Sequence, residues 1–511
     1  MRQVLAFVTA AALTGCSLIY NPSNIDPSHS EPPADAEIIL DADPSMLMVT
    51  GVNPPMILEG QGDGGSVPAL VVIDGHNMVA DGLAVTLAPI DSTPPQPAGA
   101  VPKLGVPIVA KDGNWIAIPV TALVDPTLPA GAKIQFDVQV TENVPGGGTS
   151  TAHGTLALQG LAELEPAATV TSIDTATLAS PYSRVTLASN VNFTSSATDY
   201  DYASRRAIIR ATSSISAKGL TAPAGQAGGC LGGGPGMAGA CNGGGGGNTG
   251  GGGGGGAGCA TDGGAGSGNG AGPAGPRTGD ELLVDYNGLG QTASRSPGGG
   301  GGASGLGAGG AGGAGGGLIE LTAGGDVSVG AITLNGGAGT AAGFGTGGGG
   351  GGGGAGGLVM LRAGGQLMAM SPISVAGGAG VGGGGNGANG RVRWDASTGT
   401  APTLAAPDQG TLHRGPSFII DNNNNVFRES KPTIMLRGTK GGRGNISTIS
   451  YLFNHLDPKT DSGPDVIFGD NGLASFMLNL KQGLTQVCLT LAGGSTETSE
   501  ANTCVFVAFL P

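Results

Sequence analysis

Short stretches of alternating apolar and polar residues, separated by glycine, proline and aspartate, recur along most of this 511-residue chain. Alternation with a period of two is typical of β-strands that bury one face, and the turn residues between the stretches keep each strand short. The pattern therefore predicts an all-β protein. Its strands group into three regions, residues 44–167, 171–400 and 415–511.

Residues 44–167 contain six strand-like stretches at spacings that suit a β-sandwich. They read MLMVTGV, ALVVI, LAVTLAP, NWIAIPV, IQFDVQV and GTLALQGL. The opening of the region is similar to that of immunoglobulin-like domains of the IPT/TIG type at Val52, Pro54, Ile73, Gly75 and Asn77. The resemblance implies an Ig-like β-sandwich that serves as a spacer or binding module and carries no catalytic residues.

Residues 171–400 contain a repeat. GLIELTAGGDVSVGAITLNGGAG at residues 317–339 matches GLVMLRAGGQLMAMSPISVAGGAG at residues 357–380, at an offset of 40 that rises to 41 after one inserted residue. Two diverged copies read AIIRATSSISAKGLTA and GRVRWDAS, and RVTLASNVNF has the pattern of a further copy. No single copy can bury its own apolar side, so we expect the copies to stack as coils of a parallel β-helix. The positions expected to face the interior are Ile319, Leu321, Ala323, Val327, Val329, Ile332 and Leu334, matched by Val359, Leu361, Ala363, Leu367, Ala369, Ile373 and Val375.

Long glycine runs lie between the copies, and glycine supplies 105 residues of the chain. The runs occupy residues 243–247, 250–256, 298–302 and 347–354. Ordering glycine costs backbone entropy, so the runs either stay mobile or pack as extended polyglycine helices that hydrogen-bond to one another. We favour the ordered arrangement, because chains of glycine and alanine let backbones approach closely. The composition resembles the Gly-rich repeats of bacterial surface proteins.

The last region, residues 415–511, contains five further apolar stretches and predicts a second sandwich-like β-domain. GTKGGRGN, which begins at residue 438, is interpreted as a hairpin turn. Cys488 and Cys504 lie on two strands that flank a polar stretch, and pairing these strands places the thiols opposite one another, as a disulfide requires. One further bridge and one left-over thiol, in any of three pairings, are expected among Cys230, Cys241 and Cys259.

The N-terminus has the parts of a bacterial lipoprotein signal. Arg2 precedes the apolar run VLAFVTAAAL, which is too short to span a bilayer. The run ends in a sequence that resembles a lipobox, formed by Leu13, Thr14, Gly15 and Cys16. The resemblance implies that residues 1–15 are removed and that Cys16 carries lipid. Residues 16–43, rich in proline, serine and acids, would form a flexible tether. Ser17 replaces the aspartate that commonly retains such proteins at the inner membrane, which favours the outer membrane, with the protein either facing the periplasm or exposed at the cell surface.

The net charge of −14 is concentrated in residues 17–170, which contain 17 acidic side chains and three lysines. No segment offers the basic stripe that nucleic-acid phosphates require, so nucleic-acid binding is disfavoured. No second apolar run approaches about 20 residues, which leaves the lipid as the expected membrane attachment. The remaining partners that fit are envelope or extracellular polysaccharides and surface proteins.

Candidate catalytic groups are sparse in the sequence. A polysaccharide-acting β-helix enzyme needs clustered carboxylates and a nearby basic residue. The charges on the matched strands look too few and too scattered: Glu320, Asp326, Arg362, Arg391, Arg393 and Asp395. A solvated loop is a simpler interpretation than a glycan site for Asp199, Tyr200, Asp201 and Tyr202. A strand-end turn explains Asp74 and His76 better than metal binding does, and neither a metal nor another cofactor is expected.

Two function classes remain. The sparse carboxylates favour a non-catalytic lipoprotein of the outer membrane, which presents the Gly-rich β-helix for adhesion or structural interaction. The alternative is a β-helix enzyme that acts on extracellular polysaccharide.

Lipidation of Cys16 is directly testable. Mass spectrometry of the mature N-terminus should find a lipid-modified cysteine, and Cys16→Ala should abolish partition into the membrane fraction. Each buried methylene contributes about 0.8 kcal/mol, so several acyl chains hold the protein stably. An unmodified mature N-terminus at another residue, or unchanged partition of the variant, would contradict the assignment.

Overall fold

The computed structural model of the chain describes most of residues 46–405 and the strands between residues 411 and 509. Within 46–405 it leaves out residues 67, 80–81, 91–100, 110–112, 145–147, 179–180, 195–205, 222–262, 264, 268–309 and 343–348. Regular structure in the described part is β-strand apart from one short 3-10 turn, Thr175–Thr177. The predicted all-β class is therefore confirmed.

The first region forms two sheets that pack face to face. Their orders are β1-β3-β7-β5, with β6 also paired to β7, and β2-β9-β8-β4. One hydrophobic cluster joins buried residues of both sheets, such as Ile73 and Ile116 of the first and Phe136 and Leu156 of the second. All six predicted stretches are strands. The bounds are β1 (Met48–Asn53), β2 (Met56–Leu58), β3 (Ala69–His76), β4 (Ala84–Pro89), β5 (Lys103–Leu104), β6 (Ile108–Val109), β7 (Trp115–Thr121), β8 (Lys133–Asn143) and β9 (Thr149–Gln159).

Local sequence explains these strands. Along β8 every second residue is buried, including Ile134, Phe136 and Val138, while the residues between them are exposed or half-buried. This is the alternation of a strand with one face on a core. Directly after β3, Asn77 has φ of 61°, in the left-handed region where asparagine is enriched among non-glycine residues. The Asn of the Ig-like pattern thus has a conformational role at the strand end.

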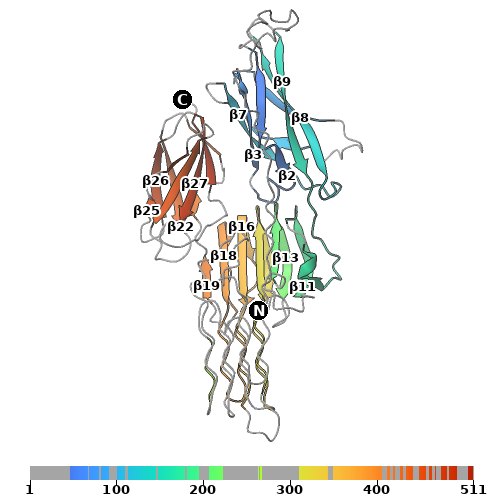
Figure 1. The fold of residues 1–511 in the computed structure, drawn as a ribbon, viewed down its shortest axis with the longest axis vertical. Coiled ribbons are helices and arrows are strands. Elements are labelled where there is room, and N and C mark those ends of the chain that lie inside the picture. Colours follow the sequence, from blue (N-terminus) through green and yellow to red (C-terminus); the bar gives the residue numbers. More distant parts are fainter. Residues whose placement is uncertain are drawn as a thin grey trace, which may run out of the picture. The chain divides into compact units, whose positions relative to one another are not determined.

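The repeat region forms one sheet in which every pair of strands is parallel. Its order is β10-β11-β13-β15-β16-β14-β12, with β17 on β15 and β18 between β16 and β19 (Figure 1). The long β16 pairs with β14 through its first half and with β15 through its second half. It therefore connects the strands on the β14 side of the sheet with those on the β15 side. The bounds are β10 (Ser172–Asp174), β11 (Val185–Thr194), β12 (Arg206–Ala211), β13 (Ile215–Thr221), β14 (Leu318–Ala323), β15 (Val327–Thr333), β16 (Leu358–Ala369), β17 (Ile373–Ser374), β18 (Arg391–Thr400) and β19 (Thr411–Arg414).

The strand register reproduces the sequence repeat. Leu321 pairs with Leu361, and Ile332 pairs with Ile373, at the offsets of 40 and 41 that the sequence predicts. The predicted interior residues have at most 3% of their surface exposed, except Ala369, which is half-buried. They form one cluster, and each fully buried Leu, Ile or Val contributes about 1.5–3 kcal/mol relative to exposure. The parallel stacked arrangement fits the predicted β-helix-like region.

The C-terminal region forms two further sheets, β20-β22-β26 and β21-β28-β27-β23-β24, with β25 on β23. All five predicted stretches are strands. The predicted hairpin turn at GTKGGRGN is wrong, because the strands on either side of it, β22 and β23, belong to different sheets. Turn-forming residues mark where a strand ends but not which strand comes next in the sheet. The bounds are β20 (Phe418–Ile420), β21 (Val426–Glu429), β22 (Thr433–Lys440), β23 (Thr448–His455), β24 (Thr460–Ser462), β25 (Val466–Ile467), β26 (Leu473–Asn479), β27 (Gly483–Leu491) and β28 (Cys504–Phe509).

The two C-terminal cysteines stand opposite each other. β27 and β28 are antiparallel, and their register pairs Cys488 directly with Cys504. The predicted strand pairing is therefore confirmed, and the disulfide between the two residues stays a prediction.

The disulfide can be mapped without reductant. Glu497 and Glu500 lie between the cysteines, so Glu-C protease should release two fragments that stay linked until they are reduced. The chain-entropy model assigns about 3 kcal/mol to a loop of about 16 residues. Free alkylation of both thiols in the folded, exported protein would contradict the bond.

Candidate functional site

Five glycine-rich segments pack beside one another at the end of the parallel sheet (Figure 1). Residues 310–317, 349–357 and 382–390 lead into β14, β16 and β18, whereas residues 335–341 and 376–381 follow β15 and β17. We call them the first to fifth glycine segments in chain order, and together the glycine bundle. The first, third and fifth segments thus directly precede the first strand of a coil, and the second and fourth follow the last strand of a coil.

Hydrogen bonds in the bundle recur at every third residue. Three residues per turn is the period of the polyproline II helix, which makes no internal hydrogen bonds and offers three faces to its neighbours. The third segment uses all three faces. The N–H groups of Gly350, Gly353 and Gly356 donate to the carbonyls of Gly382, Gly385 and Ala388 at 2.8–2.9 Å. Those of Gly351, Gly354 and Gly357 donate to Thr340, Gly337 and Leu334, and Gly349, Gly352 and Ala355 accept from Gly310, Gly313 and Gly316.

The third segment has no room for a side chain at Gly351 or Gly354. Every residue from 349 to 357 is buried. A Cβ atom on Gly351 would overlap the carbonyl of Ala311, and one on Gly354 would overlap that of Ala314. The preferred ordered packing of the glycine runs is therefore confirmed for the described part of residues 347–354. The other three runs lie outside the described residues.

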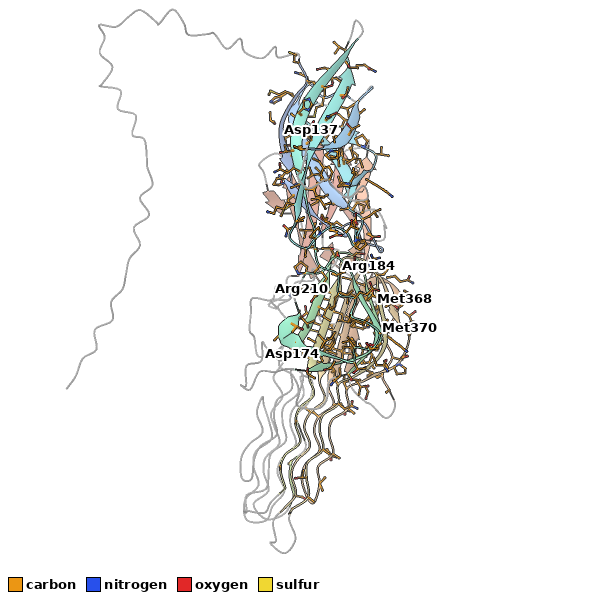
Figure 2. All side chains as sticks on the ribbon, turned by 90° about the vertical axis from the view of Figure 1, so that its right-hand side faces the viewer. Asp137, Asp174, Arg184, Arg210, Met368 and Met370 are labelled. Atoms are coloured by element: carbon orange, nitrogen blue, oxygen red, sulfur yellow. The ribbon has the colours of Figure 1, made fainter. Side chains whose placement is uncertain are left out.

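The surface of the bundle is small and uncharged. Its exposed residues include Ala311, Ala338, Thr340, Ala379 and Asn386. None of the residues in the five segments is charged or aromatic, and their side chains are short (Figure 2). Such a surface can make van der Waals contacts and hydrogen bonds with a flat partner, but it holds no acid, base or nucleophile suited to catalysis.

The charged residues of the repeat region converge, contrary to the sequence-based expectation that they are scattered. The register of β14, β16 and β18 places Glu320 beside Met360 and Met360 beside Arg393. Neighbouring rungs bring in Arg362 and Arg391. These residues alternate with core residues along their strands, so they share the face opposite the core. The offsets of 40 and 33 between paired strands align them, and no inspection of single strands reveals that alignment.

This charged face is covered. Glu320, Arg362 and Arg391 are 1% exposed and Arg393 is 2% exposed, and each takes part in further interactions within the protein. Oε1 of Glu320 also lies 3.8 Å from Nη2 of Arg210, a half-buried residue of β12 that is labelled in Figure 2. Leu318, Leu358 and Met360 are buried on the same face. A polymer substrate cannot reach these groups in this structure.

Other acids in the described part have structural roles. Both carboxylate oxygens of Glu59 accept backbone N–H groups, from Asp125 at 2.6 Å and from Leu161 at 2.8 Å. Burial raises the pKa of Glu59, and these two hydrogen bonds partly offset that rise. Asp137, labelled in Figure 2, accepts from Gln139 at 2.8 Å, which together with nearby His153 lowers the pKa of Asp137.

Among the described residues, no three His, Cys, Asp or Glu side chains gather. Asp74 lies at the end of β3, and burial raises its pKa. His76 Nδ1 lies 3.3 Å from Asn114 Oδ1. These surroundings suit a strand end.

Several predicted site residues lie outside the described part of the chain. They comprise Leu13, Thr14, Gly15 and Cys16 of the lipobox, the polar stretch Asp199, Tyr200, Asp201 and Tyr202, and the thiols of Cys230, Cys241 and Cys259. No helix in the described part is long and apolar enough to cross a bilayer. Comparisons with protein-family models, with curated proteins and with solved structures found no match to this chain.

Sequence reasoning missed two asparagines of the fifth segment. The side-chain oxygens of Asn386 and Asn389 accept the N–H groups of Gly380 and Gly377, each at 2.9 Å. Their three-residue spacing in an otherwise Gly- and Ala-rich stretch was the available signal, since it equals the period of the bundle.

The close packing of the third segment predicts the effect of one methyl group. Gly351→Ala should destabilise the repeat region by about 1–3 kcal/mol, the usual cost of overpacking. Gly51→Ala is the matched control, because the only atom near its added Cβ would be Asp74 Oδ2 at 3.8 Å. Both changes reduce the freedom of the unfolded chain alike. Calorimetry of the full chain should show a lowered transition for Gly351→Ala only, and equal unfolding profiles would contradict the packing.

Proposed function

We propose that this protein is a lipid-anchored, non-catalytic protein of the bacterial outer membrane that presents its Gly-rich repeat region for adhesion or structural interaction. The observation that carries the proposal is the glycine bundle, whose third segment is buried from residue 349 to 357 and hydrogen-bonded on three faces. Hydrogen bonds between closely packed backbones hold these segments in fixed positions, so the bundle is suited to display a rigid surface.

The rest of the chain fits a display role. The lipobox-like sequence at Cys16 supplies the anchor, and the acidic, Pro-rich residues 16–43 supply a tether. The two sheets of residues 48–159 would be an Ig-like spacer of the IPT/TIG type, and the C-terminal sheets a second sandwich-like domain. The partners proposed for the bundle are uncharged envelope or extracellular polysaccharides or surface proteins, because its exposed residues carry no charge.

An enzyme that acts on extracellular polysaccharide is the second candidate. The observation in its favour is the convergence of Glu320 with three arginines on one face of the parallel sheet. Burial argues against it, since these side chains are at most 2% exposed. A catalytic acid and the groups that bind a sugar must both reach the substrate.

Adhesion of living cells tests the proposal. Gram-negative cells that produce the full chain should bind polysaccharide-coated surfaces several-fold better than cells with Gly351→Val and Gly354→Val, compared at equal surface amounts. Both substitutions place side chains where the first segment lies, so they disrupt the bundle but leave the lipobox and the Ig-like region intact. Substituting Gly51→Ala should leave adhesion unchanged. Equal adhesion by cells with the wild-type chain, the double valine variant and the Gly51→Ala variant would contradict the display role.

An activity assay with the purified full chain distinguishes the display protein from the enzyme. Incubation of the purified chain with a panel of acidic and neutral polysaccharides should leave the chain lengths of the polysaccharides unchanged. Shortened products that disappear in a Glu320→Gln variant would favour the enzyme instead.

A further inference from the structure

The glycine bundle ends at an exposed edge formed by the fourth and fifth segments. Asn386 and Ala379 are exposed there. The N–H groups of Gly377 and Gly380 face this edge and donate to Asn389 and Asn386 side chains. No charge in these two segments opposes the approach of another chain.

One coil earlier, the matching N–H groups have backbone partners. Gly336 and Gly339 lie 41 residues before Gly377 and Gly380, which is the offset that β15 and β17 also show. Their N–H groups donate to the carbonyls of the next segment, namely Ala376 at 2.8 Å and Ala379 at 2.9 Å. The Asn386 and Asn389 amide oxygens thus stand where a further segment's carbonyls would lie.

The same comparison explains why these two positions carry side chains. At the 33-residue offset between β16 and β18, Asn386 corresponds to Gly353 and Asn389 to Gly356. A Cβ on Gly353 would overlap the carbonyl oxygen of Gly378, which belongs to the following segment. A Cβ on Gly356 would overlap that of Val375. A side chain at either position therefore excludes a following segment.

We infer that Asn386 and Asn389 close this edge against a second copy of the same chain. The partner that fits the open edge is a polyproline II backbone with glycine at every third residue, because any larger residue at the contact overlaps backbone. The corresponding edge of a second copy meets this requirement, so two opened edges could pair about a twofold axis. Unpaired backbone edges invite such association, and proteins block them with polar side chains.

The two functions of each asparagine can be separated by experiment. Asn386→Gly with Asn389→Gly removes both the hydrogen-bond acceptor and the Cβ atom. Asn386→Ala with Asn389→Ala removes the acceptor but keeps the Cβ that excludes a neighbour. Both double variants are made in the full chain and compared with the wild type.

Sedimentation velocity should find the glycine double variant dimeric at concentrations where the wild type and the alanine double variant are monomeric. Hydrogen exchange at Gly377 and Gly380, read by fragmentation mass spectrometry at concentrations that keep every chain monomeric, should accelerate about five- to tenfold in both variants, as loss of a typical hydrogen bond implies. A monomeric glycine variant with accelerated exchange would overturn the inference. Equal association of the alanine variant would also overturn it.

The single variants keep the test decisive if the glycine double variant does not fold. Asn389→Gly should accelerate exchange at Gly377 alone, and Asn386→Gly at Gly380 alone. Each single variant should associate more weakly than the double variant but more strongly than the wild type. Unchanged exchange at these two glycines, or wild-type sedimentation of both single variants, would show that the asparagines do not guard the edge.

Discussion

The repeat region depends on one requirement, that every buried backbone N–H and carbonyl group must find a partner. In the parallel sheet the strands meet it through the ladder, while Leu, Ile and Val side chains fill the interior. In the glycine bundle most backbone N–H groups donate to the carbonyls of neighbouring segments, and the side chains of Asn335, Asn386 and Asn389 accept others. The N–H group of Gly313 donates to the carbonyl of Gly352, and Leu321 pairs with Leu361 in the sheet. The two contacts span almost the same number of residues. One coil spacing therefore serves two kinds of packing.

Much of the fold is readable in the sequence because its rules are local. Alternation predicts the strands, and the 40-residue offset predicts which of them stack, so Leu321 and Leu361 meet in the core as expected. The opposition of Cys488 and Cys504 follows from two strands and a polar connection between them. The connection between β22 and β23 was not predictable, because its turn residues do not specify the partner strand.

The site was less predictable than the fold, for two physical reasons. Convergence of Glu320 with Arg393 depends on two different offsets that act across three strands, so it emerges only once all registers are known. Within a pure glycine run the three-residue period leaves no trace, because every position looks alike. The period is visible only where another residue interrupts the glycines. Ala311 and Ala314 of the first segment are an example, because they lie three residues apart and neither is fully buried.

The position of the two asparagines has a consequence for how such a gene can change length. Interior glycine segments hydrogen-bond to neighbouring segments mainly through their backbones, and the two asparagines that exclude a following segment, Asn386 and Asn389, occur in the last one. An in-frame duplication of one 40-residue unit upstream of that terminal segment creates contacts that the molecule already contains. Recombination between copies can therefore add or remove whole coils, and with them display area, without new core residues having to evolve.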